Sequence, residues 1–212
     1  MRRLPVSFTS VWDNWLQTSL QASRKHFGHL WLDTYLNSPI WRFALAPGVC
    51  GAQAWAGILM PSVDKVGRHF PLTIAISVSN PIPIPEWMEE TGVWYDQLEE
   101  LALSALRNDF DLAAFDVALS LIAVPSKCTV SSHEPKVSDQ NRGHAMTLTK
   151  QNHLQVAVRQ LSPRNTAAML NDHSLWWTGG SSHIKPSVLI REGLPVASSF
   201  SDLLEGQRLQ QK

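Results

Sequence analysis

The chain has 212 residues, of which 44% are hydrophobic, so it can bury a core and is of a size that favours a single domain. Its 18 basic and 18 acidic residues cancel, which argues against nucleic acid or an anionic membrane as a partner and favours a protein or a neutral ligand. Two cysteines, Cys50 and Cys128, are too few for a disulfide framework, so we expect reduced thiols and a reducing compartment.

No stretch of the sequence is typical of a targeting or membrane segment. The N-terminal MRRLPVSF has charge but no apolar core behind it, unlike a signal peptide. The longest apolar region, residues 43–63, is interrupted by prolines and glycines. It predicts two strands and a loop, because a membrane span needs about twenty uninterrupted apolar residues.

The first half of the chain predicts helices followed by strands. The predicted elements are helices over 7–27 and 29–36 and strands over 40–46, 55–60 and 70–79. Ser7 or Ser10 is expected to cap the first helix, and the second ends before Pro39. The links between these strands are too short for parallel crossovers, so the strands are expected to pair antiparallel, the second and third as a hairpin.

The second half begins with helices and returns to strands. The predicted elements are a long helix from Trp87, a helix over 112–123, a long polar surface loop over 126–152, strands over 154–158, 174–178 and 187–191, a short helix over 164–173, a helical turn over 200–204 and a frayed tail over 205–212. The helix over 112–123 is apolar on most sides and is expected to be buried. The long helix carries an acidic face that is either solvated or a partner surface; its residues are Glu89, Glu90, Asp96, Glu99 and Glu100.

These elements predict one α/β (α+β) domain over residues 1–212, with a mixed, largely antiparallel sheet covered by helices on both faces. The chain contains no nucleophile elbow, Walker loop, dinucleotide fingerprint or His-Glu-x-x-His segment. His26 and His29 have helical spacing but no nearby third ligand, which is more typical of surface histidines than of a metal site. We therefore expect no cofactor and no metal.

The turn in PSVDKVGRHFP (residues 61–71) is the best candidate for chemistry. A small hydrolase would use Ser62, Asp64 and His69, although nothing local orients the imidazole. A purely structural turn would use Asp64 to accept hydrogen bonds from loop amides and Arg68, with Gly67 at positive φ. A docking site would offer Arg68 to a carboxylate or phosphate of a partner.

Adjacent tryptophans, Trp176 and Trp177, present a similar choice. Neighbouring side chains on a strand point to opposite faces. Either both indoles are buried under covering helices, or one is exposed beside the GGSS turn as an interaction hot spot. In the docking hypothesis, Arg68 is the charged contact and an indole is the apolar anchor on the same side of the sheet.

Several segments together resemble the TagF (ImpM) family of type VI secretion accessory proteins: SFTSVWDNWLQTSLQASR, SPIWRFALAPGVCGAQAWAGILMPSVDKVGRHFPLTIA, SLWWTGG and SVLIREGLP. The family signature falls on Trp12, Asp13, Trp15, Pro39, Trp41, Arg42, Pro61, Ser62, Asp64, Gly67, Arg68, Phe70, Pro71, Trp176 and Trp177. The resemblance implies a cytoplasmic, non-enzymatic regulator that acts after translation, usually as a repressor of the secretion apparatus. It also implies protein partners within that system, including a forkhead-associated scaffold protein and its phosphatase and kinase pathway.

One departure from this family concerns the N-terminus. Relatives usually open with a strand of the Gly-Lys-Leu-Pro…Gly-Asp-Phe type, whereas this chain opens at RRLPVSF. If that strand belongs to the sheet, the edge of a neighbouring strand is uncovered and can pair with another chain. We therefore expect a tendency to form a homodimer, which light scattering at high concentration would detect.

Overall fold

The fold is known from a computed structural model, which describes residues 3–64, 66–78, 87, 91–123, 172–181 and 184–206. The predicted loop over 126–152 and the predicted strand over 154–158 lie outside these residues, as does the tail from residue 207. The predicted helix over 164–173 also lies outside them, apart from its last two positions. Its final residue, His173, begins a strand instead.

The described strands form one five-stranded sheet in the order β3-β2-β1-β4-β5. Its members are β1 (Trp41–Leu45), β2 (Ala54–Met60), β3 (Leu72–Val78), β4 (His173–Thr178) and β5 (Ser187–Glu192). All four pairings are antiparallel, so the described part of the sheet has no parallel pair. The predicted β2–β3 hairpin is confirmed, with an unbroken register from Ala54 opposite Val78 to Met60 opposite Leu72.

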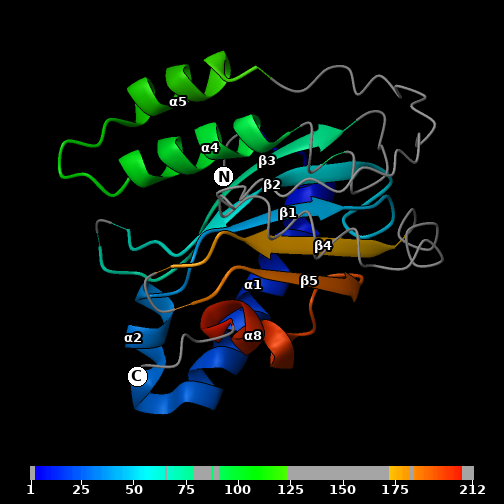
Figure 1. Cartoon of the computed structure of the whole chain (residues 1–212), viewed down its shortest axis with the longest axis vertical. Coiled ribbons are helices and arrows are strands. Elements are labelled where there is room, and N and C mark those ends of the chain that lie inside the picture. The colour runs from blue at the N-terminus through cyan, green and yellow to red at the C-terminus, as the bar shows by residue number, and fades with distance from the viewer. Residues whose placement is uncertain are drawn as a thin grey trace, which may run out of the picture.

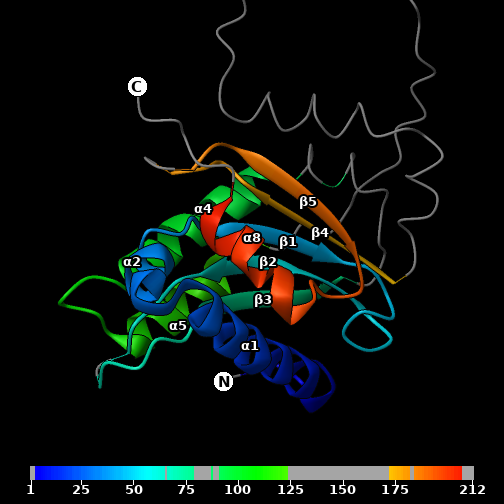
Figure 2. The same cartoon turned by 90° about the horizontal axis from the view of Figure 1, so that it is seen from below.

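Helices cover both faces of this sheet, as predicted (Figures 1 and 2). One face carries α1 (Val6–Phe27), α2 (Trp31–Leu36) and α8 (Phe200–Glu205), with 3-10 turns at Gly28–Leu30 and Ala197–Ser199; the other carries α4 (Gly92–Ser104), with α5 (Leu112–Leu121) beside it. The alternation of strand side chains divides the core accordingly. Phe43 belongs to the core beneath α1, whereas its neighbour Ala44 packs against the core beneath α4.

The start of α1 differs from the prediction. The helix begins at Val6, and Pro5 is its N-cap without any side-chain hydrogen bond. The backbone N–H groups of Phe8 and Thr9 donate to the Pro5 carbonyl at 3.1 and 3.0 Å. Ser7 therefore lies inside the helix, and the predicted serine cap is wrong. Proline is tolerated at a helix start, where its missing N–H costs no intrahelical hydrogen bond.

Aromatic side chains fill the core beneath α1, and their indole N–H groups join distant elements. Trp12 of α1 donates to the Thr73 hydroxyl of β3 at 3.0 Å. Trp15 donates to the Pro195 carbonyl at 2.7 Å, which fixes the segment before α8. The buried indoles of Trp12 and Trp15 thus contribute apolar area and also have hydrogen-bond partners for their polar atoms.

The outer helix α5 corrects another prediction. None of its residues is fully buried, although its sequence LAAFDVALSL is almost entirely apolar. Phe115 and Leu119 pack against the core beneath α4, while Val117 and Leu121 are 60% and 77% exposed. An apolar sequence shows that a helix has apolar surface, but it does not show whether other elements of the fold cover that surface.

Candidate protein-binding surface

The corner between β2 and β3 is a tight, hydrogen-bonded turn, here called the Arg68 turn (residues 62–70). Asp64 N donates to the Arg68 carbonyl at 3.0 Å, and Gly67 N donates to the Asp64 carbonyl at 2.9 Å. Gly67 has a φ of 81°, a backbone conformation that residues with a side chain rarely adopt. Towards the strands, Phe70 N donates to the Ser62 carbonyl at 3.2 Å, which closes the base of the turn.

The Asp64 carboxylate organises the turn from inside. Its Oδ1 accepts hydrogen bonds from the backbone N–H of Val66 at 3.0 Å and of Arg68 at 2.8 Å. Its Oδ2 accepts from Nε of Arg68 at 2.7 Å. The hydrogen bond from the Arg68 backbone, followed by that from its side chain, lowers the pKa of Asp64 below its usual value. The structural role predicted for Asp64 is therefore confirmed.

This arrangement leaves the Arg68 guanidinium exposed but oriented. The Arg68 side chain is 79% exposed, and its bond to Asp64 uses Nε. That bond does not use the two terminal nitrogens, and a guanidinium has the fork geometry that suits a carboxylate or phosphate. Val66 beside it is 75% exposed and Val63 is 42% exposed, so the turn combines one cation with apolar side chains.

Aromatic residues hold the base of the turn against α2. The Tyr35 hydroxyl donates to the Ser62 carbonyl at 2.9 Å and accepts from Ser62 N at 3.0 Å. Burial raises the pKa of Tyr35 to about 12, so this hydroxyl keeps its proton at neutral pH. The His69 ring packs edge-on against Trp31 and Tyr35, with ring centroids 5.5 and 5.8 Å apart. The Arg68 turn is thus fastened to the body of the domain.

The geometry does not bring the proposed hydrolase residues together. Val63 and His69 form an isolated antiparallel bridge, so their side chains lie on the same side of the turn. Ser62 is the neighbour of Val63, and alternation directs its side chain to the opposite side. The backbone of Ser62 bonds to Tyr35, while the imidazole of His69 packs against aromatic rings.

The interpretation of the tryptophan pair as an exposed anchor is wrong. Trp176 is fully buried and Trp177 is 3% exposed. Trp176 lies in the core beneath α1, where its ring stacks with Trp12 at a centroid distance of 5.9 Å. Trp177 lies in the core beneath α4 and meets Tyr95 edge-on at 4.8 Å. Helices cover both faces of β4, so neither indole joins the Arg68 turn in one surface.

An ion cluster that the sequence analysis missed lies at the acidic face of α4. Arg42 of β1 donates through Nη2 to Asp96 and through Nε to Glu99, both at 2.6 Å. Burial works to lower the pKa of Arg42, but the bonds and charges of Glu99 and Asp96 outweigh it and leave the pKa raised. Two acids of the predicted solvated face therefore tie the helix to the sheet. The signal was the lone arginine in the alternating segment WRFAL.

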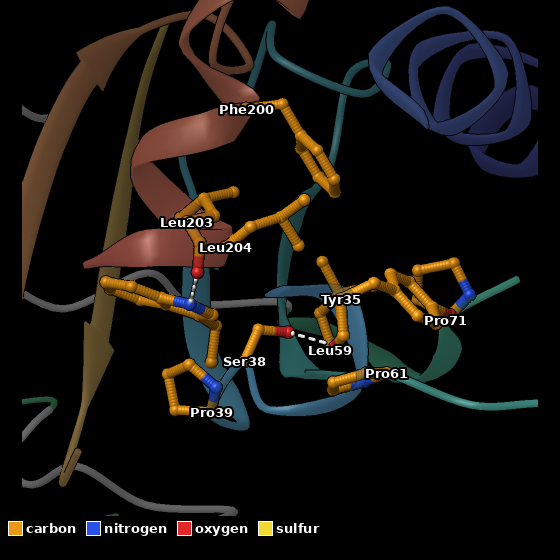
Figure 3. Close-up of a pocket in the computed structure, with 10 residues that line it drawn as sticks. Tyr35, Ser38, Pro39, Leu59, Pro61, Pro71, Phe200, Leu203 and Leu204 are labelled. Atoms are coloured by element: carbon orange, nitrogen blue, oxygen red, sulfur yellow. Dashed lines mark hydrogen bonds between the residues drawn. The ribbon is translucent and has the colours of Figure 1, made fainter. Parts of the chain in front are cut away.

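A small apolar dimple lies between the stem of the Arg68 turn and α8 (Figure 3). Its walls include Pro61 and Pro71, which flank the Arg68 turn, and Leu203 and Leu204 from α8. The Leu203 carbonyl accepts a hydrogen bond from Trp41 at 2.6 Å. The cavity volume is about 10 Å³, which is room for about one water molecule. The dimple is a small packing gap between α8 and the residues that flank the Arg68 turn.

Among the described residues, no three or more His, Cys, Asp or Glu side chains come together in a way that could ligate a metal. No helix in that part of the chain has both the length and the apolar character of a membrane-crossing segment.

Comparisons with known proteins agree with the fold and with the segments singled out above. The sequence model of a family described as "TagF N-terminal domain, Type VI secretion system-associated" matches residues 1–122. Among solved structures, the chain is similar to PA0076 from Pseudomonas aeruginosa PAO1, with 32% sequence identity and a TM-score of 0.75. That alignment covers 97% of this chain and 88% of PA0076. No curated protein sequence matches significantly.

Proposed function

This chain belongs to the TagF family of type VI secretion system-associated proteins, and from that premise we propose that it regulates type VI secretion by binding another protein of the system through the Arg68 turn. We propose that it does so in the cytoplasm, after translation, without catalysis, and as a repressor. The observation that carries the proposal is the exposed Arg68 guanidinium, which pairs with Asp64 in a turn that also exposes Val66.

The chemistry of the turn supports binding to a protein acid or phosphate group. An exposed arginine normally loses side-chain entropy when it binds, whereas Asp64 and the turn backbone already restrict Arg68 before any partner arrives. Val63 and Val66 then offer apolar area around the charge. A forkhead-associated scaffold protein, or an enzyme of its phosphorylation pathway, is our proposed partner class, and an exposed acidic or phosphorylated segment is the feature that Arg68 would recognise.

We predict that Arg68→Glu lowers recovery of partner proteins at least tenfold. The bait is the full chain, purified from cells with an active type VI system, and co-purifying proteins are quantified by mass spectrometry. Loss of an interfacial charge contact and introduction of repulsion together cost several kcal/mol, which is more than a factor of ten in affinity. Arg107→Glu is the matched control, because Arg107 is 70% exposed and is also paired with a nearby aspartate.

The same two variants test the direction of regulation. If the chain restrains the apparatus, cells carrying Arg68→Glu should secrete more than cells carrying the parent chain or Arg107→Glu. Equal partner recovery for both variants would exclude the Arg68 turn as the contact. If the parent chain binds its partner, and Arg68→Glu loses that binding and lowers secretion, the Arg68 turn stands as the contact but repression is rejected.

Homodimer formation stays a prediction. Among the described residues, β3 pairs only with β2, so its other edge is unpaired there. Its sequence, LTIAISV, contains no charged residue and no proline. Such an edge can pair with a second chain. A single monomer mass by light scattering at high concentration would contradict dimerisation.

A further inference from the structure

A second arginine, Arg24, lies on the same side of the molecule as the Arg68 turn. It belongs to the last turn of α1, and its guanidinium carbon lies 4.4 Å from the centre of the Trp31 ring at the start of α2. Trp31 also meets the ring of His69, the neighbour of Arg68, edge-on at 5.5 Å. Figures 1 and 2 both show α2 and the end of α1 on the side where β2 turns into β3. Trp31 thus contacts both Arg24 and the Arg68 turn.

No acid neutralises the positive charge of Arg24. Its side chain is exposed, and among the described residues no carboxylate lies within ion-pair distance of it. The cation–π contact with Trp31 holds the side chain against the domain but uses none of its N–H groups as hydrogen-bond donors to an oxygen. The guanidinium of Arg24 therefore keeps its capacity to bind a carboxylate.

The charge of Arg24 acts at the stem of the Arg68 turn. Burial raises the pKa of Tyr35, the hydrogen bond with the Ser62 backbone lowers it, and the charge of Arg24 lowers it further. An anionic group bound near this stem would therefore be attracted by two arginines, one from α1 and one from the turn.

Exposed apolar side chains accompany these two arginines. They come from the segment Gly28–Leu36 and from the turn, and they are Leu30, Leu32, Leu36, Val63 and Val66. A surface that combines unneutralised positive charge with apolar side chains is complementary to a protein segment that carries both acidic and apolar residues. An anionic membrane fits less well, because the exposed Asp33 of α2 and the balanced charge of the whole chain oppose its approach.

We propose that Arg24 and Arg68 form a two-arginine site that binds an acidic segment of a partner protein, with one carboxylate of the segment at each guanidinium. The proposal rests on the function proposed for the Arg68 turn and extends that contact to α1. Two acids separated by several residues can reach both arginines, because an extended segment rises ~3.3 Å per residue.

The probe for this site is the acetylated, amidated octapeptide Ser-Glu-Leu-Glu-Glu-Leu-Glu-Ser. Isothermal titration calorimetry measures its affinity for the full chain at low salt, where charge contacts are least screened. The expected result is saturable binding that weakens at least tenfold when glutamine replaces the four glutamates, because the glutamine peptide keeps the leucines and loses only the charge.

Protein variants assign the binding to the two arginines. Arg24→Gln and Arg68→Gln should each weaken the glutamate peptide at least tenfold. Lys25→Gln is the matched control: it removes the same charge from the next position of α1, but one residue further along a helix points roughly 100° away. The control should change the affinity by less than about twofold, since only a distant, screened charge is lost. Circular dichroism of each variant confirms folding.

The outcomes separate this site from the function proposed for the turn. If Arg68→Gln weakens the peptide and Arg24→Gln does not, the two-arginine site is rejected and the contact at the turn stands. If Arg24→Gln weakens it and Arg68→Gln does not, both the two-arginine site and the contact at the turn are rejected. Absence of binding, or equal losses for Arg24→Gln and Lys25→Gln, would also overturn the site.

A vesicle experiment tests the alternative of a membrane surface. The full chain should not co-sediment with vesicles made of equal parts of phosphatidylserine and phosphatidylcholine. Co-sedimentation that Arg24→Gln abolishes, without binding of the glutamate peptide, would assign the surface to anionic lipid and reject a protein segment as its occupant.

Discussion

Replacing Trp176 with alanine should lower the free energy of unfolding by about 3–5 kcal/mol, the usual loss for a buried large aromatic side chain. Trp176 is fully buried, and its ring lies between Trp15 at 5.4 Å and Phe43 at 5.4 Å. Its Nε1 donates to the Ser174 hydroxyl at 3.0 Å, and that hydroxyl donates to the Gly193 carbonyl. Alanine would leave a cavity and remove one partner from this chain of hydrogen bonds.

Urea unfolding followed by circular dichroism measures this loss. Val196→Ala is the control, because Val196 is 66% exposed and its truncation should change stability by less than about 0.5 kcal/mol. The experiment also separates the two interpretations of the tryptophan pair. An exposed anchor would tolerate alanine and lose only partner binding, so a stability loss below about 1 kcal/mol would contradict the buried position of Trp176.

Replacing Gly57 with alanine should destabilise the protein by more than about 2 kcal/mol, because one added methyl group has no space there. Gly57 lies in the middle of β2, opposite Phe43 of β1 and Ala75 of β3. A Cβ atom at this position would lie 2.0 Å from the Ile74 carbonyl oxygen and 2.9 Å from the Phe43 ring. The strands on either side of β2 would have to move apart.

Gly179→Ala is the matched control for this substitution. A Cβ atom at Gly179 meets no atom within 4 Å, and its φ is not positive. The same chemical change there should be close to neutral or slightly stabilising, since alanine restricts the unfolded chain. Equal unfolding free energies for the two variants would show that β2 does not approach its neighbours as closely as the structure indicates.

Local patterns predicted most of the secondary structure, for an identifiable reason. In β1, the residues Trp41, Phe43 and Leu45 are buried, and Arg42 and Ala44 are less so, as the alternation in WRFAL predicts. The turn at Asp64 was predictable because aspartate accepts hydrogen bonds from amides close to it in sequence. Such features depend on neighbours within a few residues, so the sequence contains the relevant information.

Long-range contacts decided the features that were predicted incorrectly or missed. The sequence marks Asp96 and Glu99 as an exposed helix face, but Arg42, more than fifty positions earlier, forms ion pairs with both. The groove lined by Trp41, Leu189 and Asp202 likewise combines residues from β1, β5 and α8. No spacing rule relates residues whose proximity depends on strand order and helix placement.

By itself, the sequence determined the strands and most helices, the hairpin at residues 61–71 and the TagF family, because periodicity and ordered motifs are local properties. Only the tertiary structure decided which apolar side chains are covered. It buried Trp176 and Trp177 on opposite faces of one strand, left much of α5 exposed and left the Arg68 guanidinium outside. The physical reason is that burial depends on what packs against a residue, and in this fold the packing partners come from distant parts of the chain.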